Sequence, residues 1–262
     1  MKVALTIAGS DSGGGAGIQA DLKTFAAHGV FGTSAITAVT VQNTRGVTGV
    51  EAISPETVAA QIRAVFEDFP VAAGKTGMLF TAPIIEAVVE TLQQFEFAVL
   101  VLDPVMVASS GDRLLKPEAE DALVGKGLPA AYVVTPNLAE AAAITGRKVE
   151  SLAEMREAAK RIFDAHGARA LVKGGHRIER ATDVLYDGKT WHEFATERLD
   201  ARNTHGTGCT LSAAIAANLA LGKELVEAVR LAKDYVTRCI RYAPGLGGGT
   251  GPMNHFPPGP TG

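Results

Sequence analysis

The chain has 262 residues, which is enough for one large α/β domain or two small ones. Hydrophobic residues make up 47% of it, and 25 basic against 28 acidic residues leave a net charge of −3. This balance excludes a general affinity for nucleic acids or anionic membranes, so any phosphate must bind at a local site. With two cysteines, no signal peptide and no apolar run of about 18 residues, we expect a reduced, soluble, cytoplasmic protein.

Short apolar, β-branched runs alternate with amphipathic segments along the chain. The runs predict strands at 3–8, 33–41, 72–76, 98–102, 132–134 and 170–172, and a hairpin of 183–186 and 190–195 around Asp187-Gly188. The amphipathic segments predict helices at 16–28, from Pro55 onward with Ser54 as N-cap, and at 82–93, 117–124, 138–144, 152–165, 209–221 and 225–242.

This alternation predicts an α/β fold with a mainly parallel central sheet, helices on both faces and an antiparallel edge hairpin. Nothing splits residues 1–244, so we expect one domain, followed by a Gly- and Pro-rich tail at 245–262 that is irregular and partly mobile. Ligands of open parallel sheets bind beyond the carboxyl ends of the strands. The candidate site loops are therefore 9–11, 42–43, 77–78, 103–105, 135–137 and 173–175.

The segment 203–212 carries the strongest chemical signal. Gly206, Thr207, Gly208 and Cys209 precede an apolar run at 213–221 that is typical of a buried helix. The first N–H groups of a helix are unpaired and lie at the positive end of its dipole, where anions and above all phosphate bind. The same field favours the thiolate of Cys209. The simpler interpretation is a helix start with a packed cysteine and no bound phosphate. Motifs elsewhere in the chain are needed to choose between the two interpretations.

Two strand ends offer oxygen ligands for a hard cation. Asp103 follows strand 98–102 and is a candidate for Mg²⁺, although capping the turn before Pro104 explains it equally well. Asn137 and Glu140 lie three residues apart at a helix start, which places them on one face. They fit a capping box, and with Asp103 they also fit a metal and phosphate shell.

Two lysines are candidates for nucleotide binding. Lys173 follows strand 170–172, where a solvated charge is the ordinary interpretation, but the two glycines after it allow a nucleotide to approach the backbone closely. Lys233 lies in a polar break of the otherwise amphipathic last helix, and its position alone makes it the weaker candidate. Together with the carboxylates and the helix start, these residues match the needs of phosphoryl transfer, which are Mg²⁺, positive groups, N–H donors and an oriented nucleophile.

Two glycine motifs point elsewhere and are set aside. Gly74-Lys75-Thr76 resembles the end of a P-loop, but Phe69 stands where the motif requires its first glycine, and the tripeptide ends a strand. The glycine run 9–17 lacks the Gly-x-Gly-x-x-Gly spacing, because Ile18 stands where the last glycine would follow Gly13 and Gly15. A nicotinamide-binding Rossmann protein is therefore disfavoured.

Seven segments, taken in order, resemble one known family. They include 9–25, which begins Gly-Ser-Asp-Ser-Gly-Gly-Gly-Ala-Gly, Asp-Pro-Val-Met-Val at 103–107, and 203–212, which begins Asn-Thr-His-Gly-Thr-Gly-Cys. The others lie at 41–46, 77–79, 135–137 and 173–176. They resemble the hydroxymethylpyrimidine/phosphomethylpyrimidine kinases of thiamine biosynthesis, in the ribokinase-like superfamily. The resemblance reaches about Tyr242 and implies a three-layer ribokinase-like fold.

The resemblance also implies an activity. A family member phosphorylates 4-amino-5-hydroxymethyl-2-methylpyrimidine on its hydroxymethyl group and then phosphorylates the product to the diphosphate, with ATP and Mg²⁺. It implies a homodimer with small-molecule substrates.

The resemblance assigns roles to individual residues. Gln42 should hydrogen-bond the aminopyrimidine, and Gly9, Asp21, Met78 and Val105 should line the same pocket, with Met78 and Val105 on the two ring faces. Cys209 stands where many relatives carry an aspartate base. The remaining roles are an anion hole for phosphate at Gly206, Thr207 and Gly208, nucleotide binding by Asn137, Lys173 and Lys233, and Mg²⁺ binding by Asp103 and Glu140.

The loop 107–112 resembles the family's lid but has Ser109 where we expect a lysine. Some related pyridoxal kinases carry a second cysteine in this lid, and Ala108 is found here instead, which disfavours a pyridoxal- or pyridoxine-type kinase without excluding side activity. The other alternative is a non-catalytic pyrimidine-binding protein. Such a protein should lose Asp103, Glu140 or the Gly-x-Gly-Cys motif, and all three are present.

Overall fold

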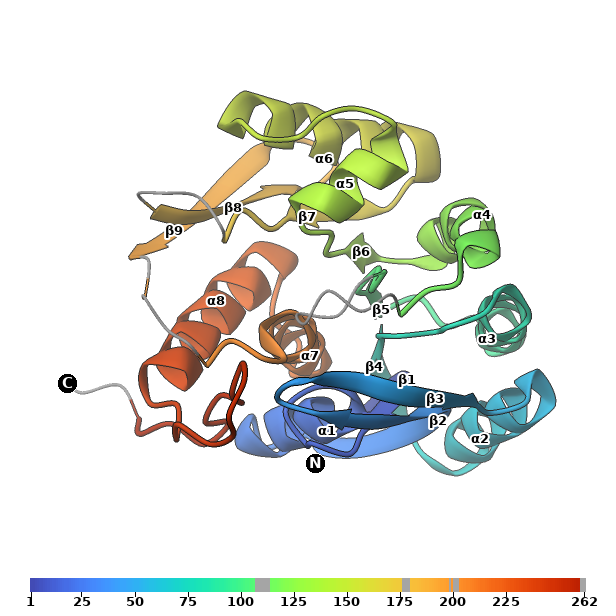
Figure 1. Cartoon of the computed structure of the whole chain (residues 1–262). Coiled ribbons are helices and arrows are strands. Elements are labelled where there is room, and N and C mark those ends of the chain that lie inside the picture. The colour runs from blue at the N-terminus through green and yellow to red at the C-terminus, as the bar shows by residue number, and fades with distance from the viewer. Residues whose placement is uncertain (107–113, 176–179, 198, 200–202, 260–262) are drawn as a thin grey trace.

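The computed structural model describes residues 1–106, 114–175, 180–197, 199 and 203–259. Within these residues, nine strands form one sheet in the order β3-β2-β1-β4-β5-β6-β7-β8-β9 (Figure 1). The strands are β1 (Val3–Asp11), β2 (Phe31–Asn43), β3 (Gly46–Ala52), β4 (Val71–Thr76), β5 (Leu100–Leu102), β6 (Val133–Val134), β7 (Arg169–Val172), β8 (Arg180–Tyr186) and β9 (Trp191–Glu197).

The pairing of the strands confirms a mainly parallel sheet with an antiparallel edge. Strands β2, β1, β4, β5, β6 and β7 are parallel neighbours, while β7–β8 and β8–β9 are antiparallel. The sequence did not predict a second antiparallel edge. This edge is formed by β3, which pairs antiparallel with β2 after a turn at Thr44 and Arg45. The sheet therefore ends in a hairpin on both sides.

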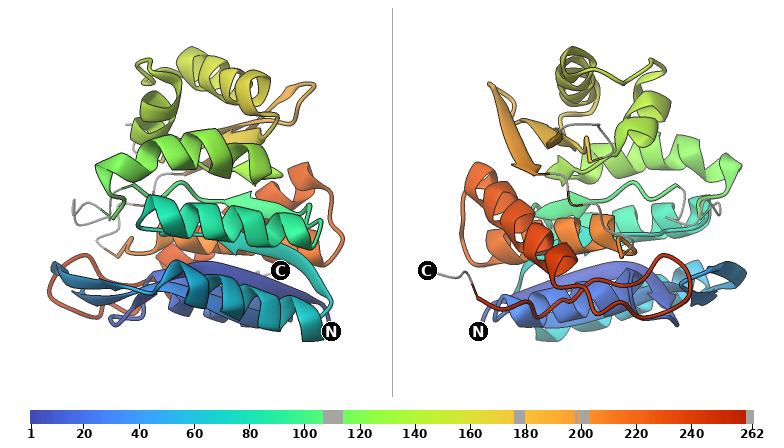
Figure 2. Two further views of the ribbon diagram at one scale, coloured as in Figure 1. Left: turned by 90° about the vertical axis from the view of Figure 1, so that its right-hand side faces the viewer. Right: turned by 60° about the vertical axis from the view of Figure 1, so that its left-hand side comes forward.

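Helices cover both faces of this sheet, as predicted. The helices are α1 (Gly17–Ala27), α2 (Pro55–Asp68), α3 (Ala82–Gln94), the short α4 (Glu120–Ala122), α5 (Leu138–Thr145), α6 (Leu152–His166), α7 (Thr207–Ala220) and α8 (Leu225–Arg241). In Figure 2, α2 and α3 come forward in one view and α8 in the other. The expected single helix at 117–124 is instead a series of 3₁₀, α and π turns that runs from Pro117 to Ala130.

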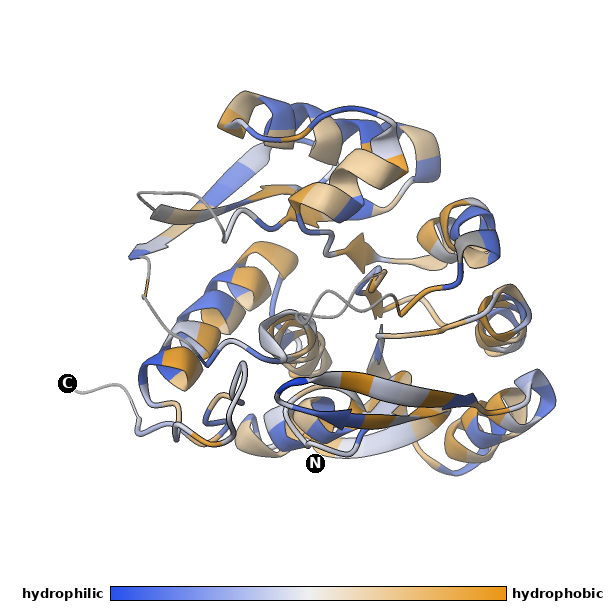
Figure 3. Ribbon diagram, viewed as in Figure 1, coloured by the Kyte–Doolittle hydropathy of each residue, from blue (hydrophilic) through white to orange (hydrophobic). Residues whose placement is uncertain are grey.

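Two buried clusters form the core, one on each face of the sheet. Successive residues of β5 separate them, because Leu100 and Leu102 belong to one cluster and Val101 to the other. This follows from the alternation of side chains along a strand. In Figure 3 the outer helices carry both hydrophilic and hydrophobic positions, whereas the central strands are mostly hydrophobic. None of the described helices combines the length and apolar character that a membrane crossing needs.

The predicted helix ends are present where the sequence places them. The Ser54 side chain accepts a hydrogen bond from the Thr57 N–H, and Pro55 is the first residue of α2. A capping box at Ser151 begins α6, which ends at Gly167 in the left-handed conformation. These caps orient the helices that lie on either side of the sheet.

The described part of the C-terminal tail, residues 245–259, is irregular, and part of it is packed against the helices. Met253 and His255 are only 3% and 4% exposed. The Tyr235 hydroxyl donates to the His255 carbonyl at 2.6 Å, and the Asn254 N–H donates to the Cys239 carbonyl at 3.1 Å. The segment around Met253 and His255 is therefore docked on α8, and the partial mobility of the tail stays a prediction.

Candidate active site

The start of α7 provides backbone donors next to the carboxyl ends of β4 and β5. Gly206 caps the helix with a φ of 83°. The N–H of Thr207 already donates to the Thr204 carbonyl at 3.2 Å, so the N–H groups of Gly208 and Cys209 are the ones left for an anion. An anion at this helix start, which stays a prediction, would meet the N–H groups of Gly208 and Cys209, one residue further along than the centre expected at Thr207.

Lys173 and Asp103 form an ion pair beside these donors. The Lys173 ammonium donates to Asp103 Oδ1 at 2.9 Å, and the Thr135 hydroxyl donates to the same oxygen at 2.9 Å. A Cβ on Gly208 would lie 3.3 Å from Lys173 Nζ and 3.4 Å from Asp103 Oδ2. The glycine therefore allows a cation and a carboxylate to approach the first turn of α7 closely.

The ionisation of Asp103 follows from its two lysine neighbours. Burial by itself raises the pKa of the Asp103 carboxyl, but the Lys173 and Lys75 ammonium groups outweigh burial and hold the pKa below its ordinary range. The same ion pair raises the pKa of Lys173 against the effect of burial. Both groups are therefore charged at neutral pH.

Asn137 and Glu140 form the capping box that their spacing suggests. The Glu140 N–H donates to Asn137 Oδ1 at 2.9 Å, and the Asn137 N–H donates to Glu140 Oε2 at 2.8 Å. Burial raises the pKa of the Glu140 carboxyl to about 7, Lys173 opposes this shift, and the negative charge of Asp103 adds to it. The helix cap thus also presents a second carboxyl group to the Asp103–Lys173 pair.

The predicted Mg²⁺ site has to be completed by the substrate. Within the described part of the chain, no group of three or more His, Cys, Asp or Glu side chains is arranged to hold a metal ion. Mg²⁺ commonly binds through one or two carboxylates, phosphate oxygens and water. Asp103 and Glu140 fit this kind of site, because they are buried carboxyl groups whose mutual repulsion a cation would relieve.

A buried ion pair that was not predicted from the sequence lies beneath the start of α7. Lys75, at the end of β4, donates to both carboxylate oxygens of Asp21 at 2.9 and 3.1 Å, and the Thr6 hydroxyl donates to Asp21 Oδ2 at 2.6 Å. Asp21 is fully buried in this pair, and its expected place in the substrate pocket stays a prediction. The signal in the sequence was a lysine within an otherwise apolar strand.

Lys75 also faces Cys209, and together with burial it determines the state of the thiol. Burial raises the pKa of Cys209 above its ordinary 9.0, Lys75 opposes the shift, and the charges of Asp21 and Asp103 add to it. The expectation that the helix field favours a thiolate is therefore wrong. Burial outweighs the dipole, and Cys209 is a thiol at neutral pH.

Three of the residues expected around the substrate ring, Gly9, Met78 and Val105, lie together. A Cβ on Gly9 would lie 3.3 Å from Met78 Sδ. Met78 and Val105 share one small apolar cluster with Ala38 and Leu114. Gln42 is half-buried near the end of β2, and its side-chain oxygen accepts a hydrogen bond from the Thr40 hydroxyl at 3.0 Å. These contacts bring Gly9, Met78 and Val105 together, and a binding pocket for the pyrimidine ring among them, with Gln42 at its edge, stays a prediction.

Lys233 is not a free cation in this structure. Its ammonium is 2.5 Å from Asp183 Oδ2 on β8, and Asp183 Oδ1 accepts the N–H of Gly174 at 2.9 Å. Asp183 therefore links Lys233 to the turn after Lys173. Direct contact between Lys233 and a nucleotide stays a prediction. The lid residues Ala108 and Ser109 lie outside the described residues.

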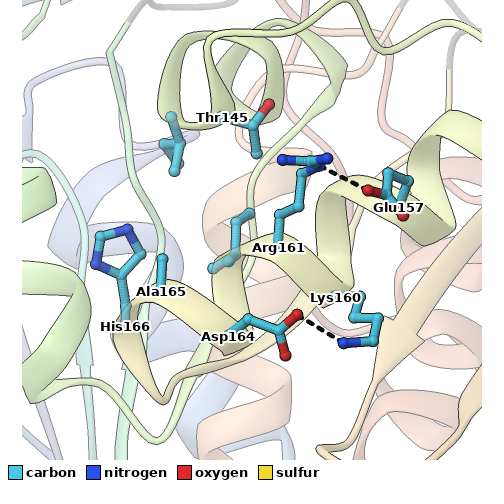
Figure 4. A pocket seen from close by; sticks show the side chains of 9 residues that line it. Thr145, Glu157, Lys160, Arg161, Asp164, Ala165 and His166 are labelled. Carbon is cyan, nitrogen blue, oxygen red and sulfur yellow. Dashed lines mark hydrogen bonds and ion pairs between the residues drawn. The ribbon is translucent and has the colours of Figure 1, made fainter.

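A separate depression lies on the outer surface between α5 and α6 (Figure 4). The charged side chains drawn there form two ion pairs, Lys160–Asp164 at 2.6 Å and Arg161–Glu157 at 2.7 Å. None of its lining residues belongs to the site at the start of α7. We therefore assign this depression no part in the chemistry.

The chain matches one family of known proteins over most of its length. The family described as phosphomethylpyrimidine kinase matches residues 11–254. A hydroxymethylpyrimidine/phosphomethylpyrimidine kinase of Rhizobium meliloti is 55% identical over 97% of each chain, and one of Bacillus subtilis is 44% identical over 97% of this chain and 94% of its own.

Solved structures show the same fold. An ADP complex of Bacillus subtilis pyridoxal kinase has a TM-score of 0.90 at 42% identity and covers 97% of both chains. A phosphomethylpyrimidine kinase of Clostridium difficile has a TM-score of 0.81 at 46% identity, over 90% of this chain and 98% of its own. The chain therefore belongs to the phosphomethylpyrimidine kinase family.

Proposed function

We propose that this protein is the ATP-dependent kinase that phosphorylates 4-amino-5-hydroxymethyl-2-methylpyrimidine to its monophosphate and then to its diphosphate, in the biosynthesis of thiamine diphosphate. The observation that carries this proposal is the position of the first turn of α7 against the Lys173–Asp103 pair. The apolar group of Gly9, Met78 and Val105 is the proposed wall of the pyrimidine pocket. Relatives that match over nearly the full length carry this activity in their names.

The chain's own groups can stabilise the transferred phosphoryl group. The N–H groups of Gly208 and Cys209 and the ammonium of Lys173 are fixed before the substrate arrives, so they need no reorganisation as charge develops. Lys75 is fully buried under the same turn and keeps a permanent positive charge there. Little covalent chemistry is required of the protein, which fits phosphoryl transfer.

ATP and Mg²⁺ are the cofactors of the proposed reaction. Asp103 and Glu140 would hold the ion, and Asn137 and Lys173 lie next to them and would contact the nucleotide phosphates. Mg²⁺ would supply positive charge to the phosphate oxygens during transfer. Gln42 would bind the aminopyrimidine edge, because a side-chain amide offers both a donor and an acceptor.

The thiolate form of Cys209, a minor species at neutral pH because the pKa of the thiol is raised, is the proposed proton acceptor for the first step only. The first nucleophile is a hydroxyl group, whose proton has to leave during transfer. The second nucleophile is a phosphate oxygen, which is already ionised at neutral pH. Loss of the thiol should therefore slow the first step far more than the second.

Separate single-step assays of ADP release test this proposal. Wild type, Cys209→Ala and, as a control, Cys239→Ala are measured with the pyrimidine alcohol and with its monophosphate. Cys239 is the other free cysteine and is buried on α8. We expect wild type and Cys239→Ala to perform both steps, and Cys209→Ala to be slowed mainly in the first. Equal losses in both steps would contradict the role given to Cys209.

Pyridoxal is the comparison substrate, because a pyridoxal kinase of Bacillus subtilis has the same fold at 42% identity. We expect much slower turnover with pyridoxal than with the pyrimidine alcohol. Faster turnover with pyridoxal would support the alternative kinase. Background turnover with both, together with retained binding of the pyrimidine, would support a binding protein instead.

A further inference from the structure

Three segments that are far apart in the sequence meet behind the start of α7. They are the glycine-rich turn after β1, at 12–16, the residues before α7, at 203–206, and the tail at 249–253. The contacts among them join the acceptor side of the site to its phosphate side. They centre on two buried polar residues, Asp11 and His205, which the proposed chemistry does not use.

Asp11 organises the glycine-rich turn. Its side chain is 3% exposed, and its Oδ1 accepts the N–H of Gly13 at 2.7 Å. Its Oδ2 accepts the N–H groups of Gly15 and Ala16 at 3.0 and 2.9 Å. Although burial raises the pKa of Asp11, these bonds and the one from His205 bring it below its ordinary value, so the carboxylate is ionised.

His205 connects this carboxylate to the start of α7. Its Nε2 lies 2.9 Å from Asp11 Oδ2 and donates to it. The next residue, Gly206, is packed so closely that a Cβ there would lie 1.8 Å from the Gly15 carbonyl oxygen. The turn and the helix start therefore touch through backbone atoms, and the Asp11–His205 hydrogen bond fixes their relative position.

The tail holds His205 from the other side. The His205 N–H donates to the Gly251 carbonyl at 3.1 Å, and His205 pairs with Pro252 in a single parallel bridge. Farther along, Thr207 Oγ1 contacts Met253 Sδ at 3.6 Å, and Thr210 Oγ1 lies 3.1 Å from His255 Nε2. The first turn of α7 is thus held between the glycine-rich turn and the tail.

We propose that Asp11 and His205 are positioning residues that set the distance between the acceptor pocket and the phosphate-binding start of α7. Asp11 is two residues from Gly9 in the pocket wall, and His205 is three residues from Gly208 in the anion site. Phosphoryl transfer depends on in-line placement, and a shift of about 1 Å can cost about 100-fold in rate. The inference rests on the proposed function.

Histidine variants with a matched control test the inference by kinetics. His205→Ala removes the bond, and His205→Gln keeps an N–H donor that can reach Asp11. His192→Ala removes another His–Asp bond, 2.7 Å to Asp187 on the β8–β9 hairpin, away from the site. We expect His205→Ala to lower kcat of both steps by about 10- to 100-fold with KM for ATP nearly unchanged, His205→Gln to recover most of it, and His192→Ala to match wild type.

Hydrogen exchange tests the structural connection without any substrate. We expect the amides of 13–16 and 204–210 to exchange faster in His205→Ala, and at wild-type rates in His205→Gln and His192→Ala. If His205→Ala does not fold, His205→Asn replaces it, because its shorter side chain cannot span to Asp11.

The two measurements separate the inference from the proposed function. Faster exchange in His205→Ala would support the structural connection between the glycine-rich turn and the start of α7. If the wild type at the same time does not phosphorylate the pyrimidine, the proposed function is refuted. Wild-type exchange and wild-type kcat in His205→Ala would overturn the inference. So would equal losses of kcat in His205→Ala and His205→Gln.

Discussion

The ammonium of Lys75 and the carboxylate of Asp21 are bonded at 2.9 Å in a place where neither side chain has any solvent exposure. Lys75 ends β4, and Asp21 lies on α1, so the pair joins the sheet to a helix that covers it. Burial alone would lower the pKa of Lys75, but Asp21 reverses the effect and raises it. The pair therefore keeps a permanent cation beneath the start of α7.

Removing one partner of the Lys75–Asp21 pair should destabilise the fold much more than replacing both partners with apolar residues. Lys75→Met leaves the Asp21 carboxylate buried without its partner, and we expect a loss of about 3–5 kcal/mol in the free energy of unfolding, measured in urea. Lys75→Met combined with Asp21→Leu removes both charges and should recover much of that loss. The exposed pair Lys126–Glu86 is the control, and Lys126→Met should have little effect. Equal effects at the two sites would contradict this account.

The raised pKa of Cys209 predicts a rate that increases in alkaline solution. The thiolate fraction grows only as pH passes the ordinary value of 9.0, while the pKa values of Lys75 and Lys173 are raised too, so both ammonium groups keep their charge. We expect kcat of the first step to increase from pH 7 to beyond 9 and kcat of the second step to stay nearly flat. Cys209→Ala should abolish the increase. A first step independent of pH over this range would refute Cys209 as the base.

The architecture could be predicted because its signals are local. Each expected strand is present, since apolar runs bounded by glycine and proline need no knowledge of distant residues. Strand β3 was missed because Gly46 and Gly49 interrupt its alternation and none of its residues is fully buried. Its stability comes from pairing with β2, which no local pattern reports.

The sequence predicted which loops form the candidate site, but it predicted the charge states of the site residues less well. The loops after the strands do meet, because parallel strands end at the same edge of the sheet. The acidic partners of Lys75 and Lys233 lie 54 and 50 residues away in the sequence. Local motifs therefore gave Lys75 no role and did not predict the ion pair of Lys233. The dipole argument for Cys209 failed for the same reason, since burial by distant segments decides its pKa.

Glu140 predicts how stability depends on pH. Its pKa is raised from 4.5 to about 7 in the folded protein, mainly by burial. The folded state therefore holds this proton more tightly, and the resulting stability is complete below pH 4.5 and is lost as pH increases to about 7. The loss is at most about 3 kcal/mol. In metal-free buffer, the difference in unfolding free energy between wild type and Glu140→Gln should decrease over this window. A constant or increasing difference would contradict the raised pKa.

Gly206 and Gly222 lie at opposite ends of α7 with nearly the same backbone angle, φ 83° and 85°, but in different surroundings. A Cβ at Gly206 would lie 1.8 Å from the Gly15 carbonyl oxygen, whereas a Cβ at Gly222 would have no atom within 4 Å. Gly222→Ala should cost only the left-handed backbone, about 1–2 kcal/mol, and leave kcat unchanged. Gly206→Ala carries the same backbone cost and also pushes the helix start away from the glycine-rich turn.

We therefore expect Gly206→Ala to lose about 100-fold or more in kcat for both steps, beyond any loss that Gly222→Ala shows. Steady-state kinetics of both variants, with thermal unfolding as the measure of folding, separates misplacement from instability. Similar kcat values in the two variants would mean that the close packing of Gly206 on Gly15 does not determine the position of the phosphate site. Because the backbone angle is matched, the difference between the variants isolates that contact.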